Sequence, residues 1–307
     1  MRRLRLFYQN NKKKILTVIG IAVFVVVLIR LANYNVERQN EENYKNTIAN
    51  NTAERNVSYA PSQSITSDTS ISEERAEENI NMIETFIEYC NNNQIEEAYN
   101  LLSNTCKEEL FPTIDDFYNH YYKDIFTEKK SYDAEMWGVS EGVTYRVKIL
   151  QDIMASGKVE EEFIEDYYTI VTEEGTSKLN IKNFVNETDI NKSNHVEDIE
   201  FQVLKKKTYI DYEEFEVQIK NNSDKKVVID TKENTETVFI RDTKGVGYGW
   251  YGHEIANNLL ELNAGETVNL AIKFNKVYNT NRKDANMHFT DIHKEGIEET
   301  LSIEIGI

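Results

Sequence analysis

An apolar run near the start of the chain sets the strongest limit on how this sequence can fold. Fifteen uncharged residues stand between Lys14 and Arg30, and twelve of them are Ile, Leu, Val or Phe. Each of these favours insertion at a helix centre by roughly 0.3–0.6 kcal/mol. As a helix, residues 15–32 would cross nearly the whole hydrocarbon core of a bilayer. The sequence therefore predicts a transmembrane helix over 15–32, anchored by Lys14, Ile15, Phe24, Ile29 and Arg30.

The charges around this run predict its orientation. The tail 1–14 holds six basic residues, and the first acidic residue of the chain is Glu37. By the positive-inside rule the N-terminus is cytoplasmic and the later residues lie outside the cell. A cleaved signal peptide and a buried core helix are the alternatives, but the I-R-L-A-N segment offers no small-x-small cleavage site. The sequence predicts a single-pass cell-membrane protein with membrane lipid as one partner.

The charge beyond the run limits the other partners. The whole chain has a formal net charge of −18, and the residues after 33 carry 28 basic against 53 acidic groups, a net charge of −25. A surface this acidic repels phosphate polyanions, so a nucleic-acid partner is not expected. It suits cations, basic partners or solubility alone.

Residues 33–71 predict a flexible polar linker. They are mostly Asn, Glu, Ser, Thr, Gln and Ala, with Pro61 near the end, and they hold few apolar groups to bury. A helix over Asn35 to Ala53 that continues the membrane span is the alternative, although no apolar heptad is visible.

The pattern becomes helical at Ser72. Apolar residues recur about every 3.6 positions over 76–90, with glutamates between them. Ser72 is the predicted N-cap of this helix. Asn93 and Thr113 are the predicted N-caps of two further helices, the last of which runs to Ile125.

Alternation replaces this pattern after Ser131. Val143, Tyr145, Val147 and Ile149 alternate with polar residues, which predicts a strand with one buried face. Further strands are predicted over Tyr132 to Trp137, Phe163 to Thr172 and Lys178 to Val185.

The segment FIEYCNNNQIEEAYNLLSNTCKEELFPTIDDFYNHYY, followed by these strands, resembles the nuclear transport factor 2-like fold. That fold is a cone-shaped α+β roll in which a sheet wraps around helices, and the resemblance covers 72–190. Membrane-anchored bacterial proteins of this fold include scaffold subunits of conjugative secretion systems, and cytosolic ones include isomerases and dehydratases. The resemblance implies a fold and permits many functions.

Every strong pattern beyond His195 is that of strands. FEVQIKNNSDKKVVI turns at Asn221 to Asp224, and LNAGETVNLAIKF turns at Ala264-Gly265. About seven short strands over 196–307 suit a β-sandwich. The turns resemble those of immunoglobulin-like domains of bacterial surface proteins, often called telokin-like. The predicted fold class is α+β, with an N-terminal single transmembrane helix, an α+β roll over 72–190 and an all-β sandwich over 196–307.

Cys90 and Cys106 are the only cysteines. A disulfide between them is one interpretation. The other, which we favour, is that both are small residues of a hydrophobic core. Neither has a histidine nearby in the sequence, so a thiol nucleophile has little support.

The five histidines are scattered, and only H-F-T-D-I-H suggests a metal. In an extended strand His288 and His293 point to opposite faces, so only Asp291 and His293 could converge, and two ligands are too few for zinc. The sequence predicts no metal and no cofactor.

The glycine-rich stretch GVGYGWYGH, residues 245–253, lacks the G-K-[ST] ending of a phosphate loop. It predicts a hairpin loop, and its aromatic residues are a possible partner contact: Tyr248, Trp250 and Tyr251.

An enzyme of the roll type needs an acid or base inside the cone, facing a hydroxyl donor. The candidates, His120, Tyr145 and Tyr168, carry no distinguishing pattern. The sequence therefore favours a non-enzymatic protein of a bacterial cell envelope that presents two outer domains to a protein partner. The alternatives are a binding module with a small ligand or peptide in the roll cavity, and a scaffold subunit of a conjugative or secretion apparatus.

Overall fold

The computed structural model describes residues 60–139, 142–151, 163–229, 237–242, 245, 247–248, 260–275 and 284–307. These residues belong to one compact unit, Ala60–Ile307. The predicted transmembrane span 15–32, with its anchors Lys14, Ile15, Phe24, Ile29 and Arg30, lies outside the described residues, and so does most of the predicted linker.

Helices occupy much of the stretch from Glu73 to Ile125 and follow the sequence signals in part. Ser72 is the N-cap of the first helix and Thr113 closes a capping box with Asp116, so both predictions are confirmed. The N-cap predicted at Asn93 is wrong, because Asn93 has a left-handed φ of 57° and Gln94 is the N-cap. The helices are α2 (Glu73–Asn91), α3 (Ile95–Asn100), α4 (Asn104–Leu110), α5 (Ile114–Phe117), η1 (Tyr118–Tyr122) and α6 (Lys123–Ile125).

The helix predicted from Thr113 to Ile125 is divided by η1, which is a π-helix. A π turn inserts one extra residue and rotates the side chains that follow it. Tyr121 and Tyr122 become buried while Tyr118 stays 42% exposed. The rings of Tyr118, Tyr122 and Phe126 stack in succession, with centroids 5.6 and 5.8 Å apart.

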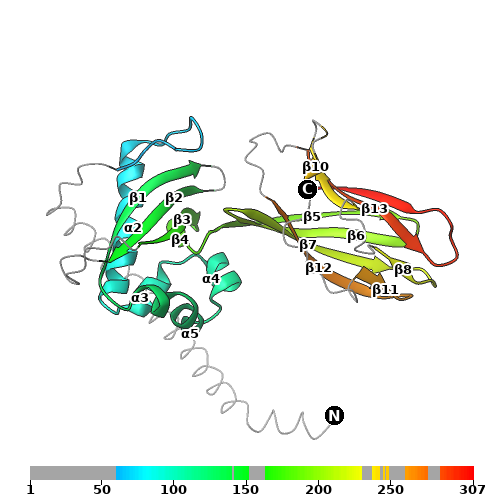
Figure 1. Cartoon of the computed structure of the whole chain (residues 1–307), viewed down its shortest axis with the longest axis horizontal. Helices are drawn as coiled ribbons and strands as arrows, with labels where there is room; N and C mark the ends of the chain where they lie inside the picture. The colour runs from blue at the N-terminus through cyan, green and yellow to red at the C-terminus, as the bar shows by residue number, and fades with distance from the viewer. Residues whose placement is uncertain are drawn as a thin grey trace, which may run out of the picture. The chain divides into compact units, whose positions relative to one another are not determined.

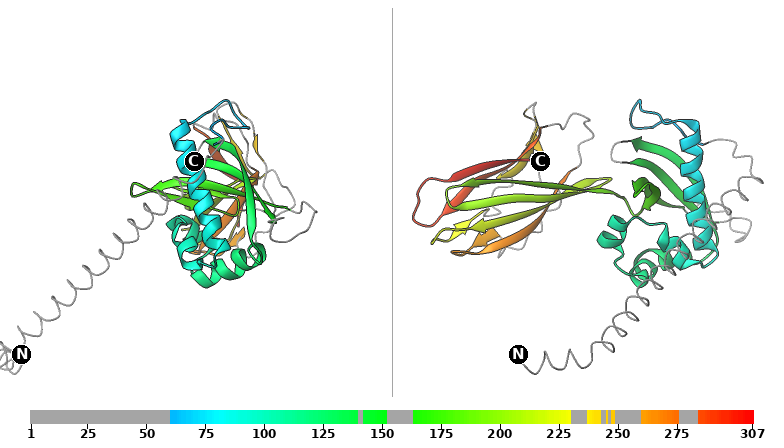
Figure 2. Two further views of the ribbon diagram at one scale, coloured as in Figure 1. Left: turned by 90° about the vertical axis from the view of Figure 1, so that its left-hand side faces the viewer. Right: turned by 180° about the vertical axis from the view of Figure 1, so that it is seen from behind.

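An antiparallel sheet, in the order β1-β2-β3-β4, lies against α2 (Figures 1 and 2). Its inner face includes Tyr145, Val147 and Tyr168, none of which is exposed. The alternation predicted for 143–149 is confirmed. The strands are β1 (Lys130–Val139), β2 (Val143–Gln151), β3 (Phe163–Glu173) and β4 (Thr176–Asn180).

Residues 60–71, the end of the predicted linker, contact β1. The hydroxyls of Ser64 and Thr66 both donate to the carbonyl of Trp137, at 2.7 and 2.6 Å, and the backbone N–H of Ile65 donates to the carbonyl of Met136. These polar residues therefore hold the chain to the sheet through hydrogen bonds rather than apolar burial.

Two further sheets share one hydrophobic core in the second half of the unit (Figure 1). One has the order β12-β7-β6-β5, and the other has the order β10-β9-β13-β8-β11 with β14 beside β13. Alternate residues of β7 and β12 are buried, as period-2 patterning requires. The strands are β5 (Phe184–Val196), β6 (Ile199–Tyr209), β7 (Tyr212–Asn221), β8 (Val227–Val228), β9 (Val238–Arg241), β10 (Gly247–Tyr248), β11 (Glu261–Leu262), β12 (Thr267–Asn275), β13 (Asn286–Lys294) and β14 (Leu301–Gly306).

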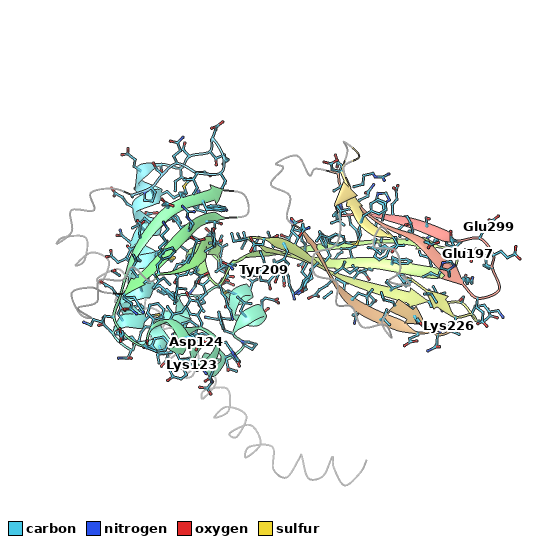
Figure 3. All side chains as sticks on the ribbon, in the orientation of Figure 1. Lys123, Asp124, Glu197, Tyr209, Lys226 and Glu299 are labelled. Carbon is cyan, nitrogen blue, oxygen red and sulfur yellow. The ribbon has the colours of Figure 1, made fainter. Side chains whose placement is uncertain are left out.

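An ionic contact joins α4 to the end of β6. The carboxylate of Glu109 accepts hydrogen bonds from the hydroxyl of Tyr209 (2.6 Å; labelled in Figure 3) and pairs with the ammonium of Lys207 (2.7 Å). Lys207 also pairs with Glu216 at 2.8 Å. Burial alone lowers the pKa of Lys207, but these two carboxylates raise it above its ordinary value. The contact keeps Lys207 charged although its side chain is only 13% exposed.

The predicted fold class is wrong. Strands hold 51% of the described residues and helices hold 22%, so this part of the chain is mostly β, and the α+β roll with an N-terminal membrane helix that the sequence predicted is not shown. Among the described residues no helix has the length and the apolar content that a membrane crossing requires. Strand β5 shows one reason why the predicted fold class is wrong. It runs from Phe184 to Val196 and so crosses residue 190, where the roll was expected to end.

Candidate functional site

The most unusual chemistry of the described residues is a buried carboxylate beside two phenols. Asp166 on β3 is 5% exposed, Tyr121 on η1 is 3% exposed and Tyr168 on β3 is fully buried. The Tyr121 hydroxyl donates to Oδ2 of Asp166 at 2.8 Å and lies 2.7 Å from the Tyr168 hydroxyl. Two elements that are far apart in the sequence, η1 and β3, thus meet at one polar cluster, which we call the Asp166 cluster: Asp166, Tyr121 and Tyr168.

Three backbone groups complete the surroundings of Asp166. Oδ1 accepts from the N–H of Tyr167 (2.7 Å) and of Asn183 (3.2 Å), and Oδ2 accepts from the N–H of Lys182 (3.3 Å). Lys182 and Asn183 both have left-handed φ angles, 58° and 64°, and they form the turn between β4 and β5. Such angles cost free energy for residues other than glycine. Asp166 therefore holds a strained turn in place.

Burial dominates the electrostatics of this cluster. It raises the pKa of Asp166 to about 6, although the hydrogen bonds from Tyr121 and the backbone act in the opposite direction. Burial and the Asp166 charge also raise the pKa of Tyr121 and Tyr168 well above the ordinary value for a phenol. Near neutral pH the cluster therefore holds one carboxylate at the end of a chain of two phenol hydroxyls.

The raised pKa predicts how stability depends on pH. The folded state holds a proton on Asp166 more tightly than the unfolded state does, so this contribution is complete below the unfolded pKa near 3.8 and is lost as the pH rises through about 6. The difference in unfolding free energy between the wild type and D166N is expected to fall by about 2 kcal/mol between pH 4 and pH 7. Urea titrations at each pH measure it. A difference that stays constant with pH would contradict the raised pKa.

The Asp166 cluster is buried in the folded chain. Its hydrogen-bonding groups are engaged within the chain, and aromatic rings enclose it: Phe86 lies edge-on to Tyr168 at 5.6 Å, and Phe117 stacks on Tyr121 at 5.8 Å. A buried carboxylate with a raised pKa is a common feature of active sites, but structural networks raise pKa values as well. The geometry here supports positioning of the β4–β5 turn.

Of the three residues considered for catalysis, Tyr145 and Tyr168 are opposite each other in the β2–β3 register, but their hydroxyls have different hydrogen-bond partners. Tyr168 belongs to the Asp166 cluster, while the Tyr145 hydroxyl accepts a hydrogen bond from the amide of Asn79 at 3.4 Å. His120 is exposed, and its carbonyl accepts a hydrogen bond from the ammonium of Lys182. Asp166 and Tyr121 were missed by sequence reasoning because no local spacing connects them.

A second candidate lies on the outer face of the β1–β3 sheet, on the side opposite the helices. Arg146 stands over the Trp137 ring at 5.5 Å and pairs with Glu135. Tyr167, opposite Arg146 in the register, meets Trp137 edge-on at 5.1 Å. Lys148 stands over Phe163 at 5.7 Å, and Phe163 is 50% exposed. We call these residues the outer patch: Trp137, Arg146, Lys148, Phe163 and Tyr167.

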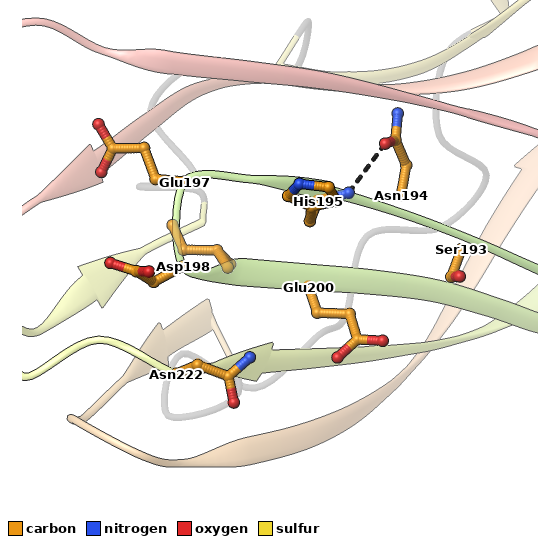
Figure 4. Close-up of a pocket in the computed structure, with 8 residues that line it drawn as sticks. Ser193, Asn194, His195, Glu197, Asp198, Glu200 and Asn222 are labelled. Atoms are coloured by element: carbon orange, nitrogen blue, oxygen red, sulfur yellow. Dashed lines mark hydrogen bonds between the residues drawn. The ribbon is translucent and has the colours of Figure 1, made fainter.

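A hollow of about 400 Å³ lies at the β5–β6 hairpin (Figure 4). Its lining is polar and acidic, and it includes His195, Glu197, Asp198 and Glu200, all exposed. Lys294 neutralises part of this charge, because its ammonium pairs with Glu197 at 2.8 Å and with Asp198 at 3.6 Å. With its acidic groups exposed to solvent, the hollow shows no feature that would select a ligand.

The cysteines are core residues. Cys90 and Cys106 are both buried and free, so the disulfide considered between them is not formed. Burial raises the pKa of Cys106 to about 12 and raises that of Cys90 further still. Both thiols therefore stay protonated near neutral pH and are poor nucleophiles.

The histidines of β13 are placed apart by a bulge. His288 stacks on Phe239 at 4.8 Å, whereas Nε2 of His293 lies 3.4 Å from Asp291. The register of β13 shifts between Phe289 and Ile292, where Asp291 has a φ of 59°. No group of three His, Cys, Asp or Glu side chains among the described residues could hold a metal ion.

The predicted aromatic contact falls largely outside the described residues. The backbone of Tyr248 in β10 pairs with that of Ile240 in β9, while Trp250 and Tyr251 are outside the described residues. Their role stays a prediction.

Comparison of the chain with family models, with curated proteins and with solved structures found no match.

Proposed function

We propose that this chain is a non-enzymatic protein-interaction module and that the outer patch is its contact surface. The observation that carries the proposal is the pairing of two cations with two aromatic rings on one sheet face, one of which is the half-exposed Phe163. Aromatic residues and arginine are the side chains that contribute most to protein interfaces. They lose little conformational entropy on binding, and here the register of three strands already holds them in position.

Trp137 adds a second argument. Its indole Nε1–H is buried and has no acceptor among the described residues. A buried donor without a partner costs about 1–3 kcal/mol. A partner that supplies a carbonyl or carboxylate, after a small shift of the ring, would recover this energy, so part of the binding free energy comes from satisfying a group that the free chain leaves unpaired.

The charges of the face indicate the chemistry of the partner. Asp133, Lys148 and Glu165 lie side by side across β1, β2 and β3, and Glu135, Arg146 and Tyr167 form the next row. Rows of alternating sign suit a partner strand or helix with its own alternating charges, and they disfavour a partner of one sign.

The test compares variants of the patch with a matched control. Crosslinking to the full-length wild type first captures the partners. The dissociation constant of each captured partner is then measured for the wild type and for the variants F163S and R146A. Each substitution is expected to weaken binding about 30-fold, the effect of a residue worth about 2 kcal/mol. The control is I297S, which removes a similarly exposed apolar side chain, 39% exposed, in the turn between β13 and β14. A partner that binds all three variants like the wild type would overturn the outer patch as the contact surface.

A further inference from the structure

The outer edge of β12 is a long regular strand edge, and no other described strand pairs with it. Its pairing with β7 runs over Thr267–Asn275 without a register shift. Regular edges of this length are templates for another strand, and proteins ordinarily interrupt them with bulges, prolines, charges or covering segments. Lys273 is the one charged residue within β12.

The other long edges of the described sheets are interrupted. β1 has a bulge after Met136 and is covered by Ser64 and Thr66. The β4 edge is covered by the backbone around Leu102, since Leu179 donates to Leu101 and accepts from Ser103. β5 has two register shifts, and the amide of Asn194 donates to the carbonyl of Glu304 on β14. Among these long edge strands, β12 is therefore the one whose edge is neither bulged nor covered by another described segment.

The register shows which backbone groups of β12 face away from β7. The N–H of Asn221 donates to the carbonyl of Glu266 at 2.9 Å, and this pair continues the β7–β12 register. Residues of one strand alternate between facing the partner and facing away. The even-numbered residues of β12 thus bond to β7. The backbone groups that face outward belong to Thr267, Asn269, Ala271, Lys273 and Asn275.

We infer that β12 pairs antiparallel with β12 of a second copy of this chain, about a two-fold axis at Ala271. Ala271 is the central residue of Thr267–Asn275, so this register uses the whole strand. It places Ala271 opposite Ala271, Asn269 opposite Lys273 and Thr267 opposite Asn275. Every outward-facing backbone group then meets another, and each such pair exchanges two hydrogen bonds.

The side chains of β12 support a second copy of β12, in this register, as the pairing strand. The single charge, Lys273, meets a neutral amide and never itself, and the residue at the axis is the smallest of the strand. The ammonium of Lys273 keeps its contact with Glu214 at 3.4 Å in its own chain. A register centred on Lys273 would oppose two like charges, which is destabilising.

The net charge of −18 acts against self-association. Since salt screens charges beyond about 10 Å at 0.1 M, the dimer fraction is expected to rise as salt is added. The salt dependence of the dimer fraction therefore distinguishes the proposed strand pairing from an interface held by ion pairs, because salt would weaken the latter.

Crosslinking of the full chain tests the register. A271C is expected to form a disulfide-linked dimer under mild oxidation, because paired Cα atoms lie about 5.5 Å apart and a disulfide accepts that separation. N269C alone is the matched control and is expected to stay uncrosslinked, since it faces Lys273. The double variant N269C/K273C is expected to crosslink again. The native thiols are buried and do not interfere.

Sedimentation of the full chain between about 1 and 100 μM then tests association without crosslinks. The wild type is expected to form dimers, and A271P is expected to weaken them at least tenfold, because proline removes an outward N–H and leaves the β7 pairing intact. A wild type that stays monomeric, or equal crosslinking of A271C and N269C, would overturn the inference. Circular dichroism shows whether A271P is folded, and the cysteine variants decide if it is not.

Discussion

Replacing Asp166 with alanine is expected to lower the free energy of unfolding by about 4 kcal/mol at pH 7. The substitution leaves three backbone N–H groups, those of Tyr167, Lys182 and Asn183, without their acceptor. Each buried orphan costs about 1–3 kcal/mol, and the empty volume adds to this. Relief of the buried charge offsets about 3 kcal/mol, as the raised pKa implies. The lost hydrogen bonds outweigh that relief.

The effect should be local as well as global. Hydrogen exchange of the D166A variant is expected to show faster exchange at the amides of Lys182 and Asn183 than at those of β2, because Asp166 is their acceptor. Urea denaturation measures the loss of stability. The matched control is E165A, whose side chain is exposed on the same strand, and it is expected to change stability by less than about 0.5 kcal/mol. If D166A and E165A unfold alike, the cluster does not hold the turn.

The signals that the sequence revealed are those that act over a few residues. The N-caps at Ser72 and Thr113 were predictable because the side chain and the N–H that it accepts from lie three residues apart. Alternation in β2 was predictable for the same reason, since burial of one face repeats every second residue.

The Asp166 cluster could not be predicted, because Tyr121 and Asp166 are brought together only by the tertiary fold. The π turn of η1 also rotates Tyr121 away from the position that a regular helix would give it. The strand predicted from Lys178 to Val185 is broken for a related reason. Its interruption at Lys182 and Asn183 depends on a carboxylate from β3, which no local preference of those two residues reveals.

The fold class was also predicted wrongly because it depends on contacts between distant parts of the chain. Sequence periodicity indicated helices and strands but not the partners of each strand, and the predicted boundary of the roll at residue 190 falls inside β5. In the structure β5 pairs with β6 over Phe184–Val196, so it belongs to the second half of the unit. Pairing over such lengths is decided by twist, bulges and shared core, and periodicity carries none of these.

Replacing Asn221 with aspartate is expected to lower the free energy of unfolding by about 4 kcal/mol at pH 7. Asn221 is fully buried, and its amide donates to the carbonyls of Lys225 (2.7 Å), Asn263 (3.0 Å) and Leu262 (3.4 Å). Its Oδ1 accepts from the N–H and the hydroxyl of Ser223. A carboxylate of the same shape would set a negative oxygen against three carbonyl oxygens, with no donor between them.

The two turns that the sequence showed separately, at 221–224 and at 264–265, are thus joined by one amide. Burial and the facing carbonyls would raise the pKa of an aspartate here, so the folded variant would bind a proton more tightly than the unfolded one. Stability of N221D should therefore recover in part as the pH falls toward 4, the opposite of what loss of an ion pair produces. The control N222D places the same charge on the neighbouring exposed side chain and is expected to change stability by less than about 0.5 kcal/mol. Urea titrations of both variants at pH 4 and pH 7 separate the two cases. Equal stability of N221D and N222D at pH 7 would mean that packing, not the Asn221 amide, holds these turns together.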